Sequence, residues 1–141
     1  MRTYIDTSIL GAYYCPEPSS AAAETALRSI GEPVISSLTE VEFCSLVAKK
    51  YRLGEFGESK ARKILEAFTA HVADGYYHRL ALTAEHYTRA RSLVGALGTT
   101  LHPLDALHLA LALTQKLPLL TADSILAAAA RRHKVKTTLV K

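Results

Sequence analysis

The sequence predicts an α/β protein with a central parallel sheet of four to five strands and helices on both faces. Short apolar runs alternate along the chain with longer segments in which apolar residues recur at helical spacing. The loops between these segments are mostly short, as in repeated strand–helix units. The 141 residues, 49% hydrophobic and 21% charged, suit one domain with one core, so we expect residues 1–141 to form it.

In the first half of the chain, turn and capping signals separate the expected elements. They are a strand over 3–5, helices from about residue 7 and over about 20–30, a strand at 34–35, and helices over about 38–52 and 58–72. Pro16 and Pro18 end the first helix, because proline removes a backbone donor and crowds the preceding turn. The N-cap candidates of the third helix are Ser36, Ser37 and Thr39.

In the second half, the expected elements are a strand over 76–82, a helix over about 83–97, a helix over 104–117, a strand over 118–121, a helix over 124–132 and a strand over 137–140. Thr83 is the predicted cap of the first of these helices, and Gly98 ends it. Pro103 stands in the first turn of the next helix, where proline is tolerated.

Four acids stand where such a fold would gather them. Asp6 and Asp123 each follow a short apolar strand directly, Asp105 lies in the first turn of an almost wholly apolar helix, and Glu42 lies about one turn into a helix that follows a strand. Ligand sites of open parallel sheets lie beyond the carboxyl ends of the strands. We therefore expect these four side chains to share one edge of the sheet.

Each acid also has a simpler interpretation. Asp6 and Asp123 could be helix caps, Asp105 could complement the helix dipole, and Glu42 could face solvent like its neighbour Glu40. The combination favours a shared acidic site, because capping alone does not require four acids at one edge.

Such a site needs a cation. Two carboxylates about 4 Å apart repel by about 4 kcal/mol at a near-surface dielectric. Mg²⁺ or Mn²⁺ prefers oxygen ligands, whereas no histidine–cysteine set has zinc spacing. An acid-bound ion of this kind suits phosphodiester hydrolysis, because it polarises the phosphoryl group and activates water.

The net charge of +4 comes from 17 bases and 13 acids. If four acids lie in one pocket, the rest of the chain carries nine acids and all 17 bases, and so has a net positive charge. This distribution suits a polyanion held by a basic surface around an acidic centre. Arg131, Arg132 and Lys134 belong to the densest basic block and are predicted to contact nucleic acid. A solvated helix end, with cations favourably placed at its C-terminus, explains the same block equally well.

Four segments, YIDTS at residue 4, SSLTEVEF at 36, LDALHLA at 104 and LTAD at 120, resemble in order and spacing the PIN-domain ribonucleases, and VapC toxins of toxin–antitoxin pairs in particular. The resemblance covers essentially the whole chain. It implies a PIN-like domain whose acidic quartet is Asp6, Glu42, Asp105 and Asp123, with Ser8 and Thr121 as supporting hydroxyls. Asp6, Asp105 and Asp123 are the implied metal ligands, with Asp6 and Asp105 binding directly. Glu42 and Asp123 would act through metal-bound water or complete a second ion site.

The resemblance further implies a magnesium-dependent endoribonuclease, with Mn²⁺ as an alternative ion, that acts as the toxin of a type II toxin–antitoxin system. A metal-activated water would hydrolyse RNA to a 5′-phosphate and a 3′-hydroxyl. The implied partners are RNA, a VapB-type antitoxin that blocks the acidic pocket, and a second copy of the chain in a homodimer. No segment approaches the length of a membrane span, so we expect no membrane partner and a cytoplasmic location.

Two other functions stay open. A PIN-fold module could hold RNA or protein without cutting, although it would not need acids that repel one another. A receiver-like domain phosphorylated on Asp6 would need a lysine after a later strand, but Lys116 precedes Pro118.

Among other residues, His108 lies one turn beyond Asp105 and could approach the site, but we expect a packed histidine with one satisfied nitrogen. Tyr13 and Tyr14 could stack on bases, with packing favoured. Cys15 and Cys44 are expected to be reduced thiols, with Cys44 in the core.

Overall fold

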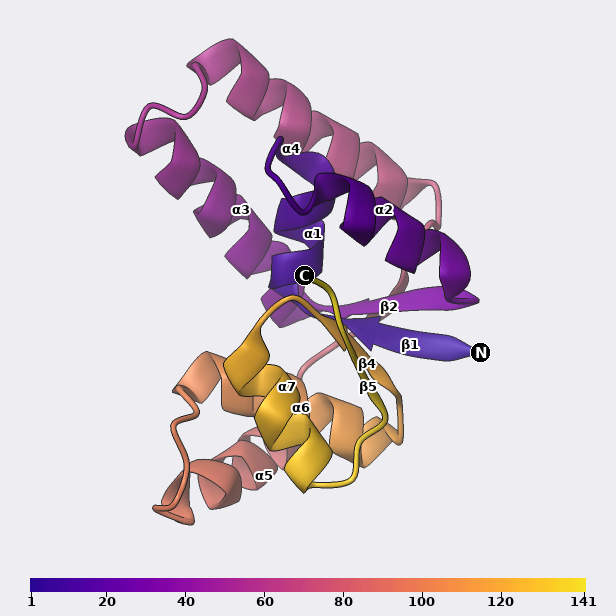
Figure 1. Ribbon diagram of the computed structural model, residues 1–141, viewed down its shortest axis with the longest axis vertical. Helices are drawn as coiled ribbons and strands as arrows, with labels where there is room; N and C mark the ends of the chain where they lie inside the picture. The colour runs from indigo at the N-terminus through magenta and orange to yellow at the C-terminus, as the bar shows by residue number, and fades with distance from the viewer.

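The computed structural model describes residues 1–141 and contains five strands and seven helices (Figure 1). The strands are β1 (Arg2–Ile5), β2 (Glu32–Ser36), β3 (His78–Leu80), β4 (Leu119–Thr121) and β5 (Thr137–Leu139). The helices are α1 (Thr7–Tyr14), α2 (Ser20–Ser29), α3 (Ser37–Arg52), α4 (Glu58–Ala73), α5 (Ala84–Gly95), α6 (Pro103–Gln115) and α7 (Ser124–Arg132). Every expected element is present in the expected order, and the differences lie at element ends.

The strands form one sheet in the order β3-β2-β1-β4-β5, and every neighbouring pair is parallel. The predicted parallel sheet is therefore confirmed, with five strands. The chain moves outward from β1 through β2 to β3 and then returns to place β4 on the other side of β1. The switch in strand order lies between β1 and β4, which is where open parallel sheets form ligand crevices.

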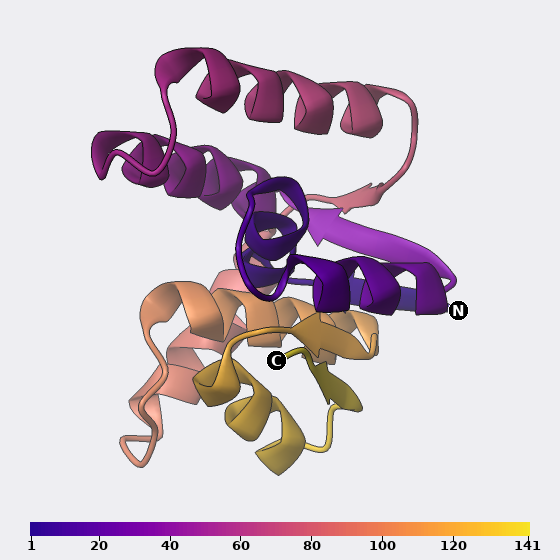
Figure 2. The same ribbon diagram turned by 45° about the horizontal axis from the view of Figure 1, so that its top comes forward.

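Helices cover both faces of this sheet (Figure 2). The strand residues of the core that also contains α5, α6 and α7 are Tyr4, Val34 and Leu119. The next residue of each strand faces the opposite core, formed with α1, α3 and α4; these residues are Ile5, Ile35 and Leu120. Because successive side chains of a strand point to opposite faces, each central strand contributes to both cores.

Local signals explain where the helices begin. The Ser36 side chain accepts a hydrogen bond from the Thr39 backbone N–H, and the Thr39 hydroxyl accepts one from the Ser36 N–H. This reciprocal cap fixes the start of α3, so Ser36 is the cap among the predicted candidates. Pro103 occupies the first turn of α6 as expected.

One expectation about the core was wrong. Cys15 is buried, with 1% of its surface exposed, but Cys44 lies on the exposed face of α3. The apolar neighbours Phe43 and Val47 take the buried face instead, because residues four apart share one side of a helix. Both thiols are free. None of the helices has the length and hydrophobicity required to span a bilayer.

Candidate active site

The four predicted acids line one pocket of about 400 Å³ at the carboxyl ends of the central strands. Asp6 immediately follows β1, Glu42 lies on α3, Asp105 is in the first turn of α6, and Asp123 precedes α7. The fold thus brings together four carboxylates from segments up to 117 positions apart.

The pocket lies at the switch in strand order. β1 and β4 pair directly, and the Asp6 backbone N–H donates to the Leu120 carbonyl over 3.3 Å. The helices that follow these two strands belong to opposite layers: α1 contributes to the core with α3 and α4, and α7 to the core with α5 and α6. Their divergence leaves space beyond the two strand ends, as the strand order predicts.

On the β1–β4 side, Asp6 is almost fully buried, with 5% of its surface exposed. Its Oδ1 accepts a hydrogen bond from the Ser8 hydroxyl over 2.7 Å. The same Ser8 oxygen accepts the Ala122 N–H over 2.9 Å and lies 3.4 Å from the Thr121 hydroxyl. Ser8 therefore ties the start of α1 to the end of β4 and orients Asp6, a supporting position like that expected for it.

Asp123 has the capping role that was one of its two interpretations. Its Oδ1 accepts the backbone N–H groups of Ile125 over 2.9 Å and Leu126 over 3.2 Å, and no hydrogen bond reaches Oδ2. The Thr121 hydroxyl accepts the Asp123 N–H over 2.9 Å and so holds the turn. Asp6, although it stands at the same position before α1, makes no capping hydrogen bond, so for Asp6 the capping interpretation was wrong.

On the α3–α6 side, Glu42 belongs to a hydrogen-bonded chain. Its Oε1 accepts the Thr7 hydroxyl over 2.6 Å and His108 Nε2 over 2.5 Å. His108 Nδ1 lies 2.6 Å from the Tyr4 hydroxyl, which also contacts the Ser36 hydroxyl at 2.9 Å. A carboxylate can only accept, so Nε2 carries a proton and, in the neutral ring, Nδ1 accepts from Tyr4.

The expectation for His108 was right about its burial and wrong about its nitrogens, of which only one was expected to have a partner. His108 is 2% exposed, but both of its ring nitrogens have partners, and one of them is the Glu42 carboxylate. The spacing of one helical turn from Asp105 was the only sequence signal. Thr7 and Tyr4 were not predicted at all, because nothing in the order of residues links them to Glu42.

The two acids respond oppositely to this environment. Burial raises the pKa of Asp6 to about 6, although His108 and the hydroxyls of Ser8 and Thr121 oppose the shift. Burial also acts to raise the pKa of Glu42, but the hydrogen bond and charge of His108 and the hydrogen bond from Thr7 lower it below its usual range. Burial and the nearby Asp123 raise the pKa of Asp105.

The predicted RNA contacts lie elsewhere. Arg131 and Arg132 stand at the C-terminal end of α7, whose nine residues place them about 13 Å along the helix from Asp123. Lys134 lies in the turn beyond, and none of the three lines the acidic pocket. The cation that does line it is Lys49 of α3.

The side chains around the pocket fit a hard divalent ion that keeps much of its water. The acidic and hydroxyl groups supply oxygen ligands only, and Asp6 has a carboxylate whose charge no cation of the chain pairs with directly. No group of three or more acidic, histidine or cysteine side chains is gathered closely enough to hold a metal ion without other ligands. Mg²⁺ commonly uses one or two carboxylates and retains several waters, so an open arrangement suits it.

Comparison with solved structures supports the fold. Similar structures include a toxin–antitoxin complex from Klebsiella pneumoniae (24% identity, 86% of this chain and 87% of that chain, TM-score 0.63). VapBC2 from Rickettsia felis, bound to a DNA fragment from its promoter, is 16% identical over 100% of both chains (TM-score 0.71). VapC20 from Mycobacterium tuberculosis, a Sarcin-Ricin loop cleaving toxin, is 16% identical over 90% of this chain and 94% of that chain (TM-score 0.70).

A comparison with curated protein sequences gave no match. The family model of the PIN domain, in contrast, matches residues 3–132, which include every residue of the acidic pocket. The chain therefore belongs to the PIN domain family.

Proposed function

We propose that the protein is a magnesium-dependent endoribonuclease and the toxin of a type II toxin–antitoxin system. The observation that carries this proposal is the meeting of Asp6, Glu42, Asp105 and Asp123 in one pocket at the strand-order switch of a PIN domain. Similar folds in a toxin–antitoxin complex and in a Sarcin-Ricin loop cleaving toxin support the assignment. Hydrolysis of an RNA phosphodiester is the chemistry that a hard ion among carboxylates serves best.

In this proposal Asp6, Asp105 and the free oxygen of Asp123 hold the ion, in part through its bound waters, because no three of these side chains are gathered closely enough to bind one ion directly. The bound ion supplies positive charge for the phosphoryl group and lowers the pKa of water. Ser8 keeps Asp6 in place through its 2.7 Å hydrogen bond. Lys49, which lines the same pocket, would bind a phosphate oxygen of the substrate.

Glu42 has a different part in the proposed reaction. Thr7 and His108 hold its Oε1, so the carboxylate has one fixed orientation and stays ionised at neutral pH. A carboxylate with a lowered pKa is a weak proton acceptor. We therefore assign Glu42 to orienting the attacking water through a hydrogen bond at Oε2, and His108 to positioning Glu42.

A VapB-type antitoxin and a second copy of the chain are the proposed protein partners. The solved toxin–antitoxin complexes of the same fold support an antitoxin partner. A segment that inserts an arginine would neutralise the pocket well, because guanidinium and carboxylate form paired charge-assisted hydrogen bonds.

Cleavage of a labelled single-stranded RNA by the purified chain tests the proposed activity. We expect cleavage with Mg²⁺ or Mn²⁺, none in excess chelator, and none with Asp105→Asn although that variant stays folded. Asp74→Asn, which alters an exposed acid at the end of α4, is the matched control and should cleave normally. Undiminished cleavage by Asp105→Asn or in chelator would overturn the proposal, and RNA binding without any cleavage would indicate a non-catalytic module.

A further inference from the structure

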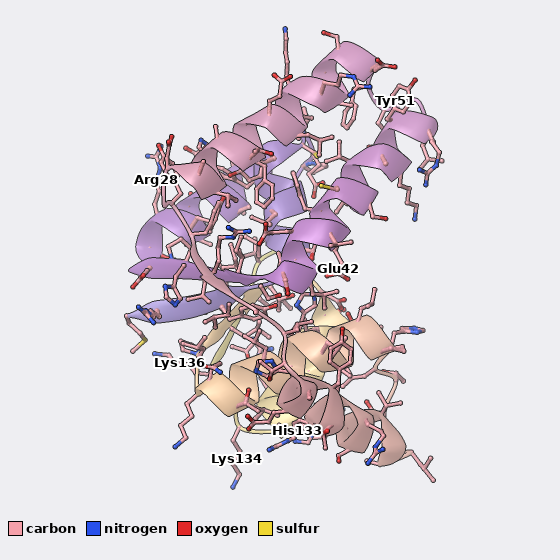
Figure 3. The ribbon with its side chains drawn as sticks, turned by 180° about the vertical axis from the view of Figure 1, so that it is seen from behind. Arg28, Glu42, Tyr51, His133, Lys134 and Lys136 are labelled. Atoms are coloured by element: carbon pink, nitrogen blue, oxygen red, sulfur yellow. The ribbon has the colours of Figure 1, made fainter.

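A second hollow, of about 340 Å³, opens at the amino-terminal edge of β4, opposite the edge that carries the acidic pocket. We call it the basic hollow. Lys116, Lys134 and Lys136 line it, and its apolar residues include Leu113, Leu117 and Val135. Lys116 is the C-cap that follows α6, while Lys134 and Lys136 lie between α7 and β5. In Figure 3, Lys134 and Lys136 lie well away from Glu42.

The charge around the basic hollow is unbalanced. After Glu85 the chain has eight lysines and arginines but only two acids, Asp105 and Asp123, and both line the acidic pocket. The lysines and arginines that form ion pairs with acids belong to the first 80 residues, such as Arg2 with Glu32 and Arg79 with Glu40. No lysine of the basic hollow forms an ion pair, and no acid lines it.

Two of its lysines also stand in strained backbone positions. Lys116 has φ of 54° and Lys134 has φ of 63°, in the left-handed region where glycine is the usual residue. A residue with a side chain at such a position destabilises the native state. Lysine at both positions therefore weakens the fold locally while it places positive charge at the hollow.

We propose that the basic hollow binds the phosphate backbone of the RNA substrate at a distance from the cleaved bond. Unpaired lysines with no competing acid suit a polyanion, and Arg131 and Arg132 at the end of α7 extend the positive surface. This inference rests on the proposed ribonuclease function for the identity of the polyanion. It also replaces the expected basic rim around the acidic pocket with a separate site.

The geometry makes this contact depend on the length of the RNA. The hollow and the pocket lie beyond opposite ends of β4, whose three residues span about 10 Å. A strand must pass over the surface of the molecule to reach both, so a short oligonucleotide in the acidic pocket cannot also contact the lysines. Long or folded RNA can contact both the pocket and the lysines.

Binding of unfractionated transfer RNA, measured by fluorescence anisotropy in chelator so that nothing is cut, tests the proposal. Lys116→Gly with Lys134→Gly removes both charges and relieves both strained positions, so its Tm should not fall below that of the parent. We expect about tenfold weaker binding near physiological salt, and a slope of log affinity against log salt that is smaller by about 1.5. Lys60→Gln with Lys63→Gln removes two exposed, unpaired lysines of α4 and should change neither quantity.

Equal binding by the glycine variant and the parent would overturn the inference, as would equal loss in the α4 control. Preferential binding of duplex DNA over transfer RNA, with the same lysine dependence, would reject RNA as the occupant. Cleavage separates the inference from the proposed activity: the ratio of transfer RNA cleavage to short oligouridylate cleavage should fall in the glycine variant. If the parent cuts neither RNA but binding still depends on the lysines, the ribonuclease proposal fails and the RNA site stands.

Discussion

The two sides of the acidic pocket each contain a buried or half-buried carboxylate, but they shift its pKa in opposite directions. On the α3–α6 side, Glu42 receives hydrogen bonds from Thr7 and His108, and its pKa lies below the usual range. On the β1–β4 side, Asp6 is buried beside the Ser8 and Thr121 hydroxyls, which do not offset the cost of burial, and its pKa is raised to about 6. The same pocket thus contains one acid stabilised as an anion by the protein and one that is not.

This difference in pKa suggests a different role for each side of the pocket. A carboxylate that already has a histidine and a hydroxyl as donors gains little from a cation at the same oxygen. A buried carboxylate with a raised pKa gains much, because a bound cation offsets the cost of burying its charge. In the proposed function the β1–β4 side would therefore be the centre of ion binding, and the α3–α6 side would orient what binds there.

Replacement of Asp6 should have the largest effect. Asp6→Asn keeps the shape and can still accept the Ser8 hydrogen bond, but it removes the charge that the ion requires. We expect RNA cleavage to fall by about 10³-fold or more, since metal-derived stabilisation of the transition state amounts to several kcal/mol. Single-turnover cleavage rates measure it, with Asp74→Asn as the control. A loss of less than tenfold would place the ion elsewhere.

The pH dependence of stability without metal should show the next largest effect. The folded pKa of Asp6, about 6, lies above the ordinary 3.8, so its contribution to stability is complete below pH 4 and is lost as the pH rises through 6. The loss amounts to about 3 kcal/mol. In chelator, Asp6→Asn should therefore be more stable than the parent at pH 8 and similar to it at pH 4, by urea unfolding. A difference in unfolding free energy that does not vary with pH would show that the pKa of Asp6 is not raised in the folded protein.

Replacement of His108 should give an intermediate effect. His108→Gln cannot bridge Tyr4 and Glu42 as the ring does, and loss of such a supporting partner typically lowers activity 10- to 100-fold. His86 is the matched control, because it is equally buried at 2% but accepts the Thr83 N–H over 3.0 Å at the start of α5. His86→Gln should destabilise the fold without this loss of rate. Similar rates for both folded variants would make His108 a packing residue only.

Replacement of Tyr4 should give the smallest effect. Tyr4→Phe keeps the buried ring but removes the hydroxyl that meets His108 at 2.6 Å and Ser36 at 2.9 Å. Leaving buried polar partners unsatisfied costs about 1–3 kcal/mol of stability. Cleavage by the folded variant should fall less than in His108→Gln. Tyr77→Phe, whose hydroxyl contacts Tyr14 outside the pocket, should lose stability without any change in rate.

Most of the fold could be predicted because its signals are local. The starts of the elements are indicated by serine and threonine before apolar runs, by Pro103 in a first turn and by the short apolar strands. The alternation of strands and helices then favours a parallel sheet. Cys44 was placed wrongly because it lies beside buried Phe43, and one position along a helix turns a side chain by about 100°. The buried face can be assigned only when the whole helix is considered.

In the site, too, the positions that depend on local signals could be predicted and the contacts between distant segments could not. Asp6 and Asp123 each directly follow a predicted strand, so their meeting at one edge of the sheet could be expected. The contact between His108 and Glu42 joins residues 66 positions apart, and it depends on how α3 and α6 cross the sheet. The separation of Arg131 and Lys134 from the pocket likewise depends on the direction of α7, which the order of residues does not state.

The most direct test of the account is the effect of Mn²⁺ or Mg²⁺ on the Tm of the parent and of Asp6→Asn at neutral pH, measured by calorimetry. Saturating ion should raise the Tm of the parent, since binding at about 100 times Kd adds about 2.7 kcal/mol, and should leave Asp6→Asn almost unchanged. The rise in the parent should also disappear as the pH falls below about 6, where Asp6 takes up a proton. An equal rise in both proteins, or none in the parent, would contradict an ion centred on Asp6.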